Sequence, residues 1–380
     1  MGIFYELQSE LKAIEESTDH DGYWYNVSDT LLLLVCGLLC GLQRIDDIHD
    51  WAKSAPALKF LHERFGIVKI LGRSQFYNIL KLVDAEKFKQ SFTRWMKFVL
   101  SGGIKDKTVA IDGKTVCGTD KLSENDSVLH IASAIVSELN LVIGTHECNT
   151  KMGEIKAFRE LIAMLDIEGA VVVADALHCN QKSAQAVIEA KADYLFVVKD
   201  NLPTLKNEIQ LFFETQNTDS QITKEKNGGR IETRTAYASC DIRWLINCEK
   251  WPNLSCVGAI HRQFEKSGTK SSEWHFYISS KNLTPNELLT HARLEWAVES
   301  LHWLLDVHYA EDKTRIWDMN VQKLLNTARK IALNLIRIYK EASCKKNTPL
   351  TSVMKANLFD IEVLDGFLEF LRHCKFVELD

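Results

Sequence analysis

The sequence predicts an α/β domain flanked on both sides by helices, and three observations support this. Over the first 100 residues, apolar side chains recur at helical spacing. From residue 104 to residue 213 the pattern changes to three strands, followed by alternating helices and strands. From residue 284 onward, helical spacing returns and continues almost to the end of the sequence.

The composition is that of an ordinary globular protein. The chain has 380 residues, of which 46% are hydrophobic and 26% charged, and a formal net charge of −5. A dedicated non-specific nucleic-acid binder is usually basic, so this charge counts mildly against DNA without excluding a local basic face. The ten cysteines show no CxxC pair and no zinc-type spacing, which favours free thiols in a reducing cytoplasm.

Residues 1–103 are predicted to form a helical domain that ends at Ser101-Gly102-Gly103. Candidate caps are Ser28-Asp29 for the second helix and Ser74 for the fifth. Two interpretations of this region stay open: a helix-turn-helix DNA reader, or an accessory bundle that only packs. The expected helices are residues 7–16, 31–42, 46–52, 56–65, 73–83 and 85–100.

Residues 104–213 begin with three strand patterns and then alternate between helix and strand. A hairpin around Ser137-Glu138 joins the second and third strands. Three antiparallel strands followed by alternating helices and parallel strands is the order of a ribonuclease H-like sheet. The expected strands are residues 108–111, 128–136, 139–145, 170–174 and 194–198, and the expected helices are 153–165, 181–190 and 203–213.

Residues 216–280 interrupt this order and are predicted to be a β-rich insertion. Residues 217–229 are polar and are expected to form a loop, followed by strands at residues 230–239, 256–260 and 274–278. A Thr284-Pro285 turn then starts a long helix over residues 287–307, and another helix covers residues 321–339. The predicted α/β domain therefore spans residues 104–340, and residues 341–380 form a helical tail.

Two of the predicted strands end on an aspartate, Asp112 and Asp175. A buried carboxylate without a partner costs several kcal/mol, so it needs a cation or a metal. If both strands belong to one sheet, the two carboxylates lie at one edge and can hold a divalent metal. The alternative is that Asp175 simply caps the helix that follows it.

A third acid is expected on the helix after the insertion. Glu295 and Glu299 are four residues apart and therefore share one helical face. Two aspartates and a glutamate form an all-oxygen site, which suits Mg²⁺ or Mn²⁺ rather than zinc. Two such ions about 3.5–4 Å apart can activate a water or a 3′-hydroxyl and stabilise the leaving oxygen of a phosphoryl transfer.

Five segments, in order along the chain, resemble the H-repeat-associated family of DDE transposases, which are bacterial insertion-sequence enzymes. They are AIDGK at 110–114, ADALHCNQK at 174–182, ADYLFVVKDN at 192–201, GRIETR at 229–234 and WAVESLHWLLDVHYAEDKTR at 296–315. The resemblance extends from the N-terminal helices to about Tyr339. It implies a ribonuclease H-like core with a β insertion, a helical domain in front of it, and a DDE triad that binds two Mg²⁺ ions, with Mn²⁺ as a substitute.

The resemblance assigns the triad to Asp112, Asp175 and Glu299. Glu299 matches the acid of the family's Trp-x-Ile-Glu-Asn pattern, here Trp-Ala-Val-Glu-Ser at residues 296–300. The family usually has His directly before that Trp, where this chain has Glu295. Glu295 therefore stays open as an alternative third acid, and Glu311 is a more distant candidate.

Basic residues near these segments are candidates for contacts with DNA phosphates. Related transposases carry Arg and Lys around the third acid, but Asp306 stands here where they have Lys. Lys199 can instead pair with Asp200, and Arg230 and Arg234 can pair with Glu232. The candidate DNA-binding residues are Lys114, Lys199, Arg230, Arg234, Arg293, Lys313 and Arg315.

The resemblance implies a DNA transposase that nicks DNA at the ends of its own element and joins the 3′-hydroxyl to target DNA. The expected partners are double-stranded DNA and further copies of the chain, as a homodimer or a larger assembly. A cytoplasmic location without membrane contact is expected. Three alternatives stay open: a non-catalytic regulatory DNA-binding protein of the same fold, a metal-dependent nuclease without strand transfer, and a two-carboxylate sugar hydrolase.

Overall fold

In the computed structural model, the described residues form one mixed sheet in the order β3-β2-β1-β4-β5-β9-β8-β7-β6. The structure describes residues 2–16, 18, 26–116, 129–148, 153–216, 218–227, 229–266 and 269–375. The strands are β1 (Thr108–Val116), β2 (Leu129–Val136), β3 (Leu141–Cys148), β4 (Val171–Ala174), β5 (Asp193–Val198), β6 (Ser220–Asn227), β7 (Arg230–Ser239), β8 (Cys256–Lys266) and β9 (Thr269–Ser279).

The first five strands confirm the predicted ribonuclease H-like order. β1, β2 and β3 pair antiparallel, whereas β1, β4 and β5 pair in parallel. The predicted start of the second strand, residue 128, lies outside the described residues. β4 and β5 are buried on both faces, which explains why their sequences are continuous apolar runs.

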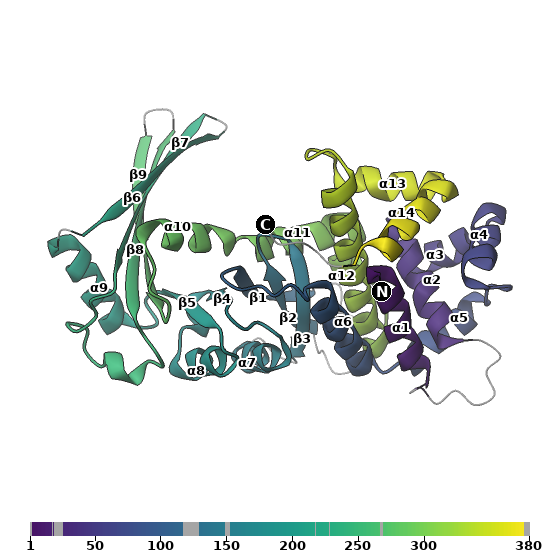
Figure 1. Ribbon diagram of the computed structural model, residues 1–380, viewed down its shortest axis with the longest axis horizontal. Coiled ribbons are helices and arrows are strands. Elements are labelled where there is room, and N and C mark those ends of the chain that lie inside the picture. Colours follow the sequence, from purple (N-terminus) through teal and green to yellow (C-terminus); the bar gives the residue numbers. More distant parts are fainter. Residues whose placement is uncertain are drawn as a thin grey trace.

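The predicted insertion extends this sheet, because β9 pairs antiparallel with β5. Strands β6–β9, called the arm below, project beyond the rest of the sheet (Figure 1). The predicted loop at residues 217–229 was wrong over residues 220–227, which form β6 and pair with β7. Most side chains of β6 are exposed, so no alternating apolar face marked it as a strand.

Helices cover both faces of the sheet. α7 (Glu154–Met164), α8 (Gln181–Glu189) and α9 (Pro203–Thr215) pack on one face. On the other face, α10 (Pro285–Leu294) packs on a buried apolar layer that includes Val173 and Val197. α11 (Ala297–Tyr309) follows α10 and lies against β1 and β2. The single helix predicted over residues 287–307 was therefore wrong, because the chain breaks at Glu295 and Trp296.

Among the described residues, six helices precede the sheet, as predicted. Two of the predicted caps were wrong: Asn26 is the N-cap residue of the second helix, which begins before Ser28, and Gly72 occupies that position in the fifth. The second helix starts earlier because Val27 and Ser28 are already buried. The helices are α1 (Ile3–Glu16), α2 (Val27–Leu39), α3 (Ile45–Ala52), α4 (Ala55–Phe65), α5 (Arg73–Leu82) and α6 (Ala85–Val99).

The last three helices join the N-terminal ones in a single bundle (Figure 1). α12 (Met319–Ser343) packs against α2, α6 and β3. α13 (Leu350–Phe359) packs against α2, and α14 (Ile361–His373) packs against α1. Within the predicted helical tail, α13 and α14 therefore belong to this bundle. None of the described helices is both long and apolar enough to cross a membrane.

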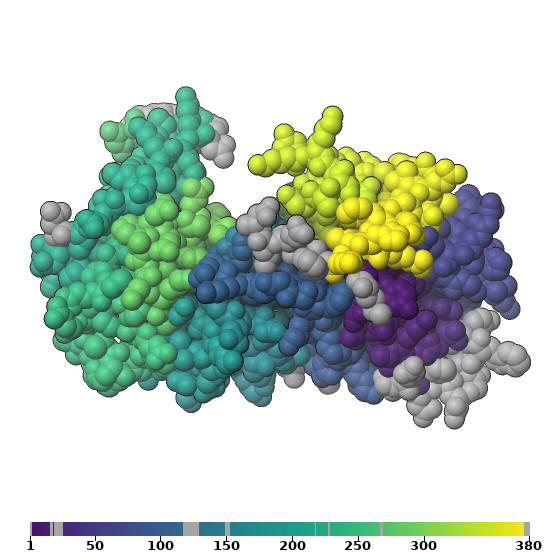
Figure 2. All heavy atoms as spheres, in the orientation of Figure 1, coloured from purple at the N-terminus to yellow at the C-terminus, as the bar shows by residue number. Residues whose placement is uncertain are grey.

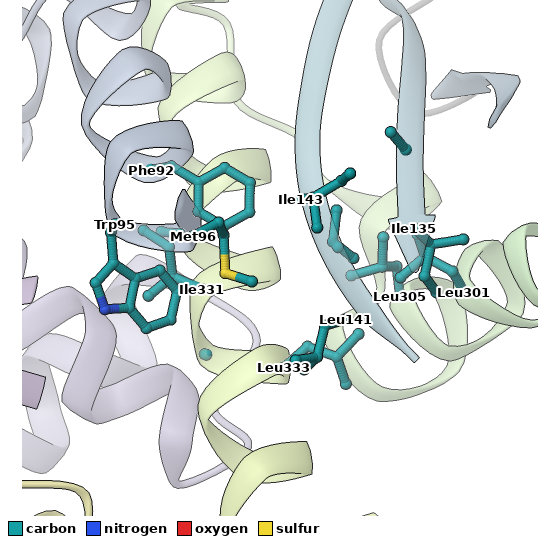
Figure 3. Close-up of a cluster of buried hydrophobic side chains, with 14 of the residues drawn as sticks. Phe92, Trp95, Met96, Ile135, Leu141, Ile143, Leu301, Leu305, Ile331 and Leu333 are labelled. Atoms are coloured by element: carbon teal, nitrogen blue, oxygen red, sulfur yellow. The ribbon is translucent and has the colours of Figure 1, made fainter. Parts of the chain in front are cut away.

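The bundle and the sheet share one hydrophobic core, which Figure 3 shows at their junction. Trp95 and Met96 of α6 and Ile331 of α12 lie opposite Ile143 of the edge strand β3. The buried Asn334 of α12 is also bonded to this strand. Its amide accepts a hydrogen bond from the Val142 N–H (3.0 Å) and donates one to the Val142 carbonyl (2.7 Å).

Candidate active site

The register of β1 and β4 brings the two predicted aspartates together. Ala110 lies opposite Val173 in the parallel pair. Continuing two residues along both chains places Asp112 opposite Asp175, with both side chains on the face covered by α10 and α11. The prediction that Asp112 ends its strand was wrong, because β1 continues to Val116 along β2. It lies instead where β1 extends beyond its pairing with β4.

Asp112 and Asp175 line a cleft of about 790 Å³ between the sheet, the arm and the junction of α10 and α11. Glu295 and Glu299 line the same cleft, so four of the five acids predicted from the sequence lie there. Figure 2 shows that the arm stands apart from the helical end of the molecule and that the surface between them is hollowed. The basic side chains that line the cleft are Lys199, Arg230, Arg234, Arg262, Lys266 and Arg293.

The two aspartates differ in their electrostatic surroundings. Burial raises the pKa of Asp112 to about 6, and the carboxylates of Glu154 and Asp175 add to the effect. Burial acts on Asp175 as well, but the Lys199 ammonium at 2.8 Å and the Ala176 N–H outweigh it and hold the pKa of Asp175 below its usual value. Asp175 thus caps the short helix Ala176–His178, whereas Asn180 caps α8.

The structure leaves both candidates for the third acid inside the cleft. Glu299 is exposed in the first turn of α11, whereas Glu295 is half-buried at the break between α10 and α11. Burial raises the pKa of Glu295 to about 7, and the carboxylates of Asp175, Asp112 and Glu299 contribute. Glu311 does not line the cleft. Its side chain is only 2% exposed and pairs with Lys114.

The acidic side chains of the cleft suit a divalent cation in their donor chemistry. They offer carboxylate oxygens, which hard cations prefer. Burial and the neighbouring carboxylates raise the pKa values of Asp112 and Glu295. Over the described part of the chain, no three His, Cys, Asp or Glu side chains are already grouped as metal ligands. Lys199 also holds one oxygen of Asp175, so binding a cation there requires side chains to move.

These pKa values predict how stability depends on pH when a chelator is present. For Asp112 and Glu295 the folded-state pKa, about 6 and about 7, lies above the unfolded value near 4. At these two groups the folded protein therefore binds more protons than the unfolded chain between about pH 4 and pH 7, so their contribution to stability falls as pH rises through that window. We expect the Tm of the wild type to fall, relative to that of the double variant Asp112→Asn/Glu295→Gln, as pH rises from about 4 to about 7. Equal slopes would contradict the raised pKa values.

Most of the predicted basic residues lie in the cleft, but acids already neutralise several of them. Lys199 pairs with Asp175, not with Asp200, which bonds to Lys206 at 2.7 Å. Arg234 pairs with Glu232 at 2.8 Å and Glu225 at 3.1 Å, and Arg293 pairs with Glu225 as well. The exposed Arg230 packs over the ring of Phe264, 3.9 Å from its centroid.

The other three predicted basic residues do not line the cleft. Lys114 is half-buried among carboxylates, whereas Lys313 and Arg315 are exposed at and after the short helix Glu311–Lys313. Trp296 and Trp303 lie at the surface, where they are 55% and 59% exposed.

Sequence reasoning missed functional candidates on the longer strands and on α11. Arg262 and Lys266 line the cleft from the part of β8 beyond its predicted end at residue 260. Arg262 pairs with Glu232 and Glu273, while Lys266 is exposed. The half-buried ring of His302 on α11 lies 3.9 Å from Asp112. Burial lowers the pKa of His302 to about 4, so it is neutral at pH 7.

Two sequence models of known families match this chain. One, described as "Transposase DDE domain", matches residues 104–335, and one described as "DDE_Tnp_1-associated" matches residues 8–96. The chain belongs to the DDE_Tnp_1 family of transposases. The resemblance carried by the five segments is thereby confirmed. Membership implies a nucleotidyl-transfer enzyme of the DDE class that uses a divalent metal.

Several Escherichia coli proteins of this family are similar to the chain. "H repeat-associated putative transposase YhhI" of strain K12 is 32% identical over 348 residues, which cover 87% of this chain and 91% of the relative. "H repeat-associated putative transposase YbfD" of the same strain is 32% identical over 247 residues, covering 62% of this chain and 96% of the relative. A cryo-EM structure of the piggyBac transposase synaptic complex with hairpin DNA aligns with a TM-score of 0.45 at 12% identity, covering 99% of this chain and 80% of that one.

Proposed function

We propose that this protein cleaves DNA at the ends of its own element and joins the freed 3′-hydroxyl to target DNA. The observation that supports this most is the meeting of Asp112, Asp175 and the Glu295/Glu299 pair in one cleft with basic walls. Its proposed cofactor is Mg²⁺, as two ions for which Mn²⁺ substitutes. Its proposed partners are double-stranded DNA and further copies of the chain, because two DNA ends have to be joined.

In this proposal Asp112, Asp175 and Glu299 hold the metal ions, which supply an activated attacking oxygen and stabilise the leaving oxygen. The low pKa of Asp175 keeps its carboxylate ionised at neutral pH. His302 is neutral, so it does not compete as a cation for Asp112. The exposed Arg230 and Lys266 are the cleft residues best placed to contact phosphates, which give affinity with little sequence information.

Lys313 and Arg315 stay candidates for phosphate contacts outside the cleft. Both are exposed, unlike Lys114, which carboxylates surround. Arg234, Arg293 and Lys199 contact DNA in this proposal only if phosphates displace their glutamate or aspartate partners. Such contacts depend strongly on salt, so affinity should fall as the salt concentration rises.

The function is tested by a strand-joining assay on labelled DNA that carries the element's ends. With Mg²⁺ or Mn²⁺ we expect both cleaved and joined products, and none in excess EDTA. Cleaved ends without joined molecules would indicate a nuclease instead. DNA binding without any cleavage would indicate a regulatory protein, and activity that survives EDTA would exclude a metal-dependent mechanism.

A second comparison in this assay decides the third acid. We expect Glu299→Gln to lower strand joining by about a thousand-fold, the loss that follows removal of one group stabilising transition-state charge. Glu295→Gln should stay within about ten-fold of the wild type, because it removes a neighbouring charge but no metal ligand. The reverse order would move the assignment to Glu295, one turn away.

A further inference from the structure

Lys114 lies two residues after Asp112 on β1, and three carboxylates surround its ammonium. It pairs with Asp306 of α11, with Glu311 at 3.0 Å and with Asp312 at 3.2 Å. These four residues are called the Lys114 cluster below. The Lys114 side chain is 12% exposed. Burial acts to lower the pKa of Lys114, but the carboxylates outweigh it and raise that pKa, so the lysine is charged.

The Lys114 cluster continues into the helical bundle. The buried carboxylate of Glu311 accepts a hydrogen bond from Asn326 of α12, and Asn326 accepts one from Lys330. Lys330 also donates to Thr145 of β3 at 3.3 Å. Buried charges persist only when they are paired, so this network ties β1, α11, α12 and β3 to one arrangement.

The end of α11 is shaped to bring two of these acids back to Lys114. The helix ends at Ala310, whose φ of 48° and ψ of 42° lie in the left-handed region. A residue with a Cβ in this conformation costs free energy and persists only where its surroundings demand it. The reversal places Glu311 and Asp312 beside the lysine of β1.

Two contacts place α11 in register along β1. His302 faces Asp112 at 3.9 Å, and Asp306, four residues later, pairs with Lys114, two residues after Asp112. Four helical residues rise about 6 Å and two strand residues about 6.6 Å, so the two contacts fit the same alignment. Glu299 is on α11, three residues before His302. Its position relative to Asp112 therefore follows from this register.

We propose that Lys114 is a positioning residue whose ion pairs hold α11 along β1 and thereby set the separation of Asp112 and Glu299. The inference rests on the proposed function, in which these two acids share metal ions. It replaces the sequence-based prediction that Lys114 contacts a DNA phosphate. The burial of Lys114 and its three carboxylate partners support the positioning role.

The proposal is tested with Lys114→Met, Lys114→Arg and Asp306→Asn, with Lys191→Met as a control at an exposed ion pair with Glu168. Calorimetric titration with Mn²⁺, without DNA, should show about ten-fold weaker binding for Lys114→Met and Asp306→Asn, a loss typical of residues that orient metal ligands. Lys114→Arg should restore most of the affinity because it keeps the charge. Unchanged Mn²⁺ affinity in the first two variants would overturn the proposal.

DNA binding separates the positioning role from a phosphate contact. We expect DNA affinity and its salt dependence to match the wild type in Lys114→Met. The alternative outcome is a fall in DNA affinity together with a decrease of about one in the slope of log affinity against log salt concentration. That outcome would show that Lys114 contacts a phosphate and would overturn the proposal. If Lys114→Met does not fold, the Mn²⁺ affinity of Asp306→Asn tests the proposal instead. That variant leaves Lys114 paired with Glu311 and Asp312.

Hydrogen–deuterium exchange keeps this inference separate from the proposed function. Amides of α11 should exchange faster in Asp306→Asn than in the wild type, while those of α8 should not change. If the wild type binds no Mn²⁺, the proposed function fails, and the exchange measurement still decides whether the Lys114 cluster holds α11. Unchanged exchange in α11 would overturn that role.

Discussion

Asp112→Asn and Asp175→Asn are each expected to lower strand joining by about a thousand-fold or more. Each substitution keeps the shape of the side chain but removes the charge that would hold a divalent cation. DNA affinity should not fall, because each substitution removes a negative charge from a cleft that, in this proposal, binds a polyanion. The measurement is joined product per unit time at saturating Mg²⁺, with DNA binding followed in parallel.

Asp200→Asn is the matched control for these substitutions. Asp200 lies two residues past the end of β5, is 90% exposed and pairs with Lys206, outside the cleft-lining set. Its activity should match the wild type. If Asp175→Asn kept strand joining within about ten-fold of the wild type, Asp175 would be only the cap of its short helix and not a metal ligand.

Asn334→Ala is expected to destabilise the fold by about 2–4 kcal/mol. The substitution removes both hydrogen bonds to Val142, leaving a buried N–H and a buried carbonyl of the edge strand β3 without partners. The consequence extends beyond one strand, since α12 joins the bundle to the sheet through this contact and the surrounding core. Denaturant unfolding measures the loss, and exchange of the Val142 amide localises it.

Asn286→Ala is a suitable control because Asn286 is exposed in the first turn of α10. A surface substitution of this kind should change stability by no more than about 0.5 kcal/mol. A loss below about 1 kcal/mol for Asn334→Ala would contradict the structural importance of the contact. It would mean that water or a shift of β3 satisfies the Val142 backbone.

The pattern of apolar residues was sufficient to predict the elements that bury one or both of their faces. The apolar runs of β4 and β5 and the helical spacing of α7 and α12 were predicted with ends close to those observed. In the arm, β7 was predicted with its observed ends, whereas β6 was missed and β8 and β9 were predicted too short, because β6 and the outer parts of β8 and β9 have few buried apolar side chains. Such strands exist because their backbones pair with neighbours, and pairing partners are distant in sequence.

The break at Glu295 and Trp296 also could not be predicted from spacing. Both residues have helical or nearly helical backbone angles, so apolar periodicity passes through the break almost unchanged. The break nevertheless decides that Glu295 is half-buried and Glu299 exposed. Whether either acid binds a metal therefore depends on a local bend that the sequence does not reveal.

By itself, the sequence determined the order of the elements apart from β6 and the α10–α11 break, the two aspartates that follow apolar runs, and membership of the family through five ordered segments. Only the tertiary structure decided which charges are already neutralised. Lys114 meets acids nearly 200 residues away, and Lys199 meets Asp175 rather than its neighbour Asp200. The reason is physical: an ion pair depends on sheet register and helix packing, which bring distant residues within about 4 Å and which no local pattern encodes.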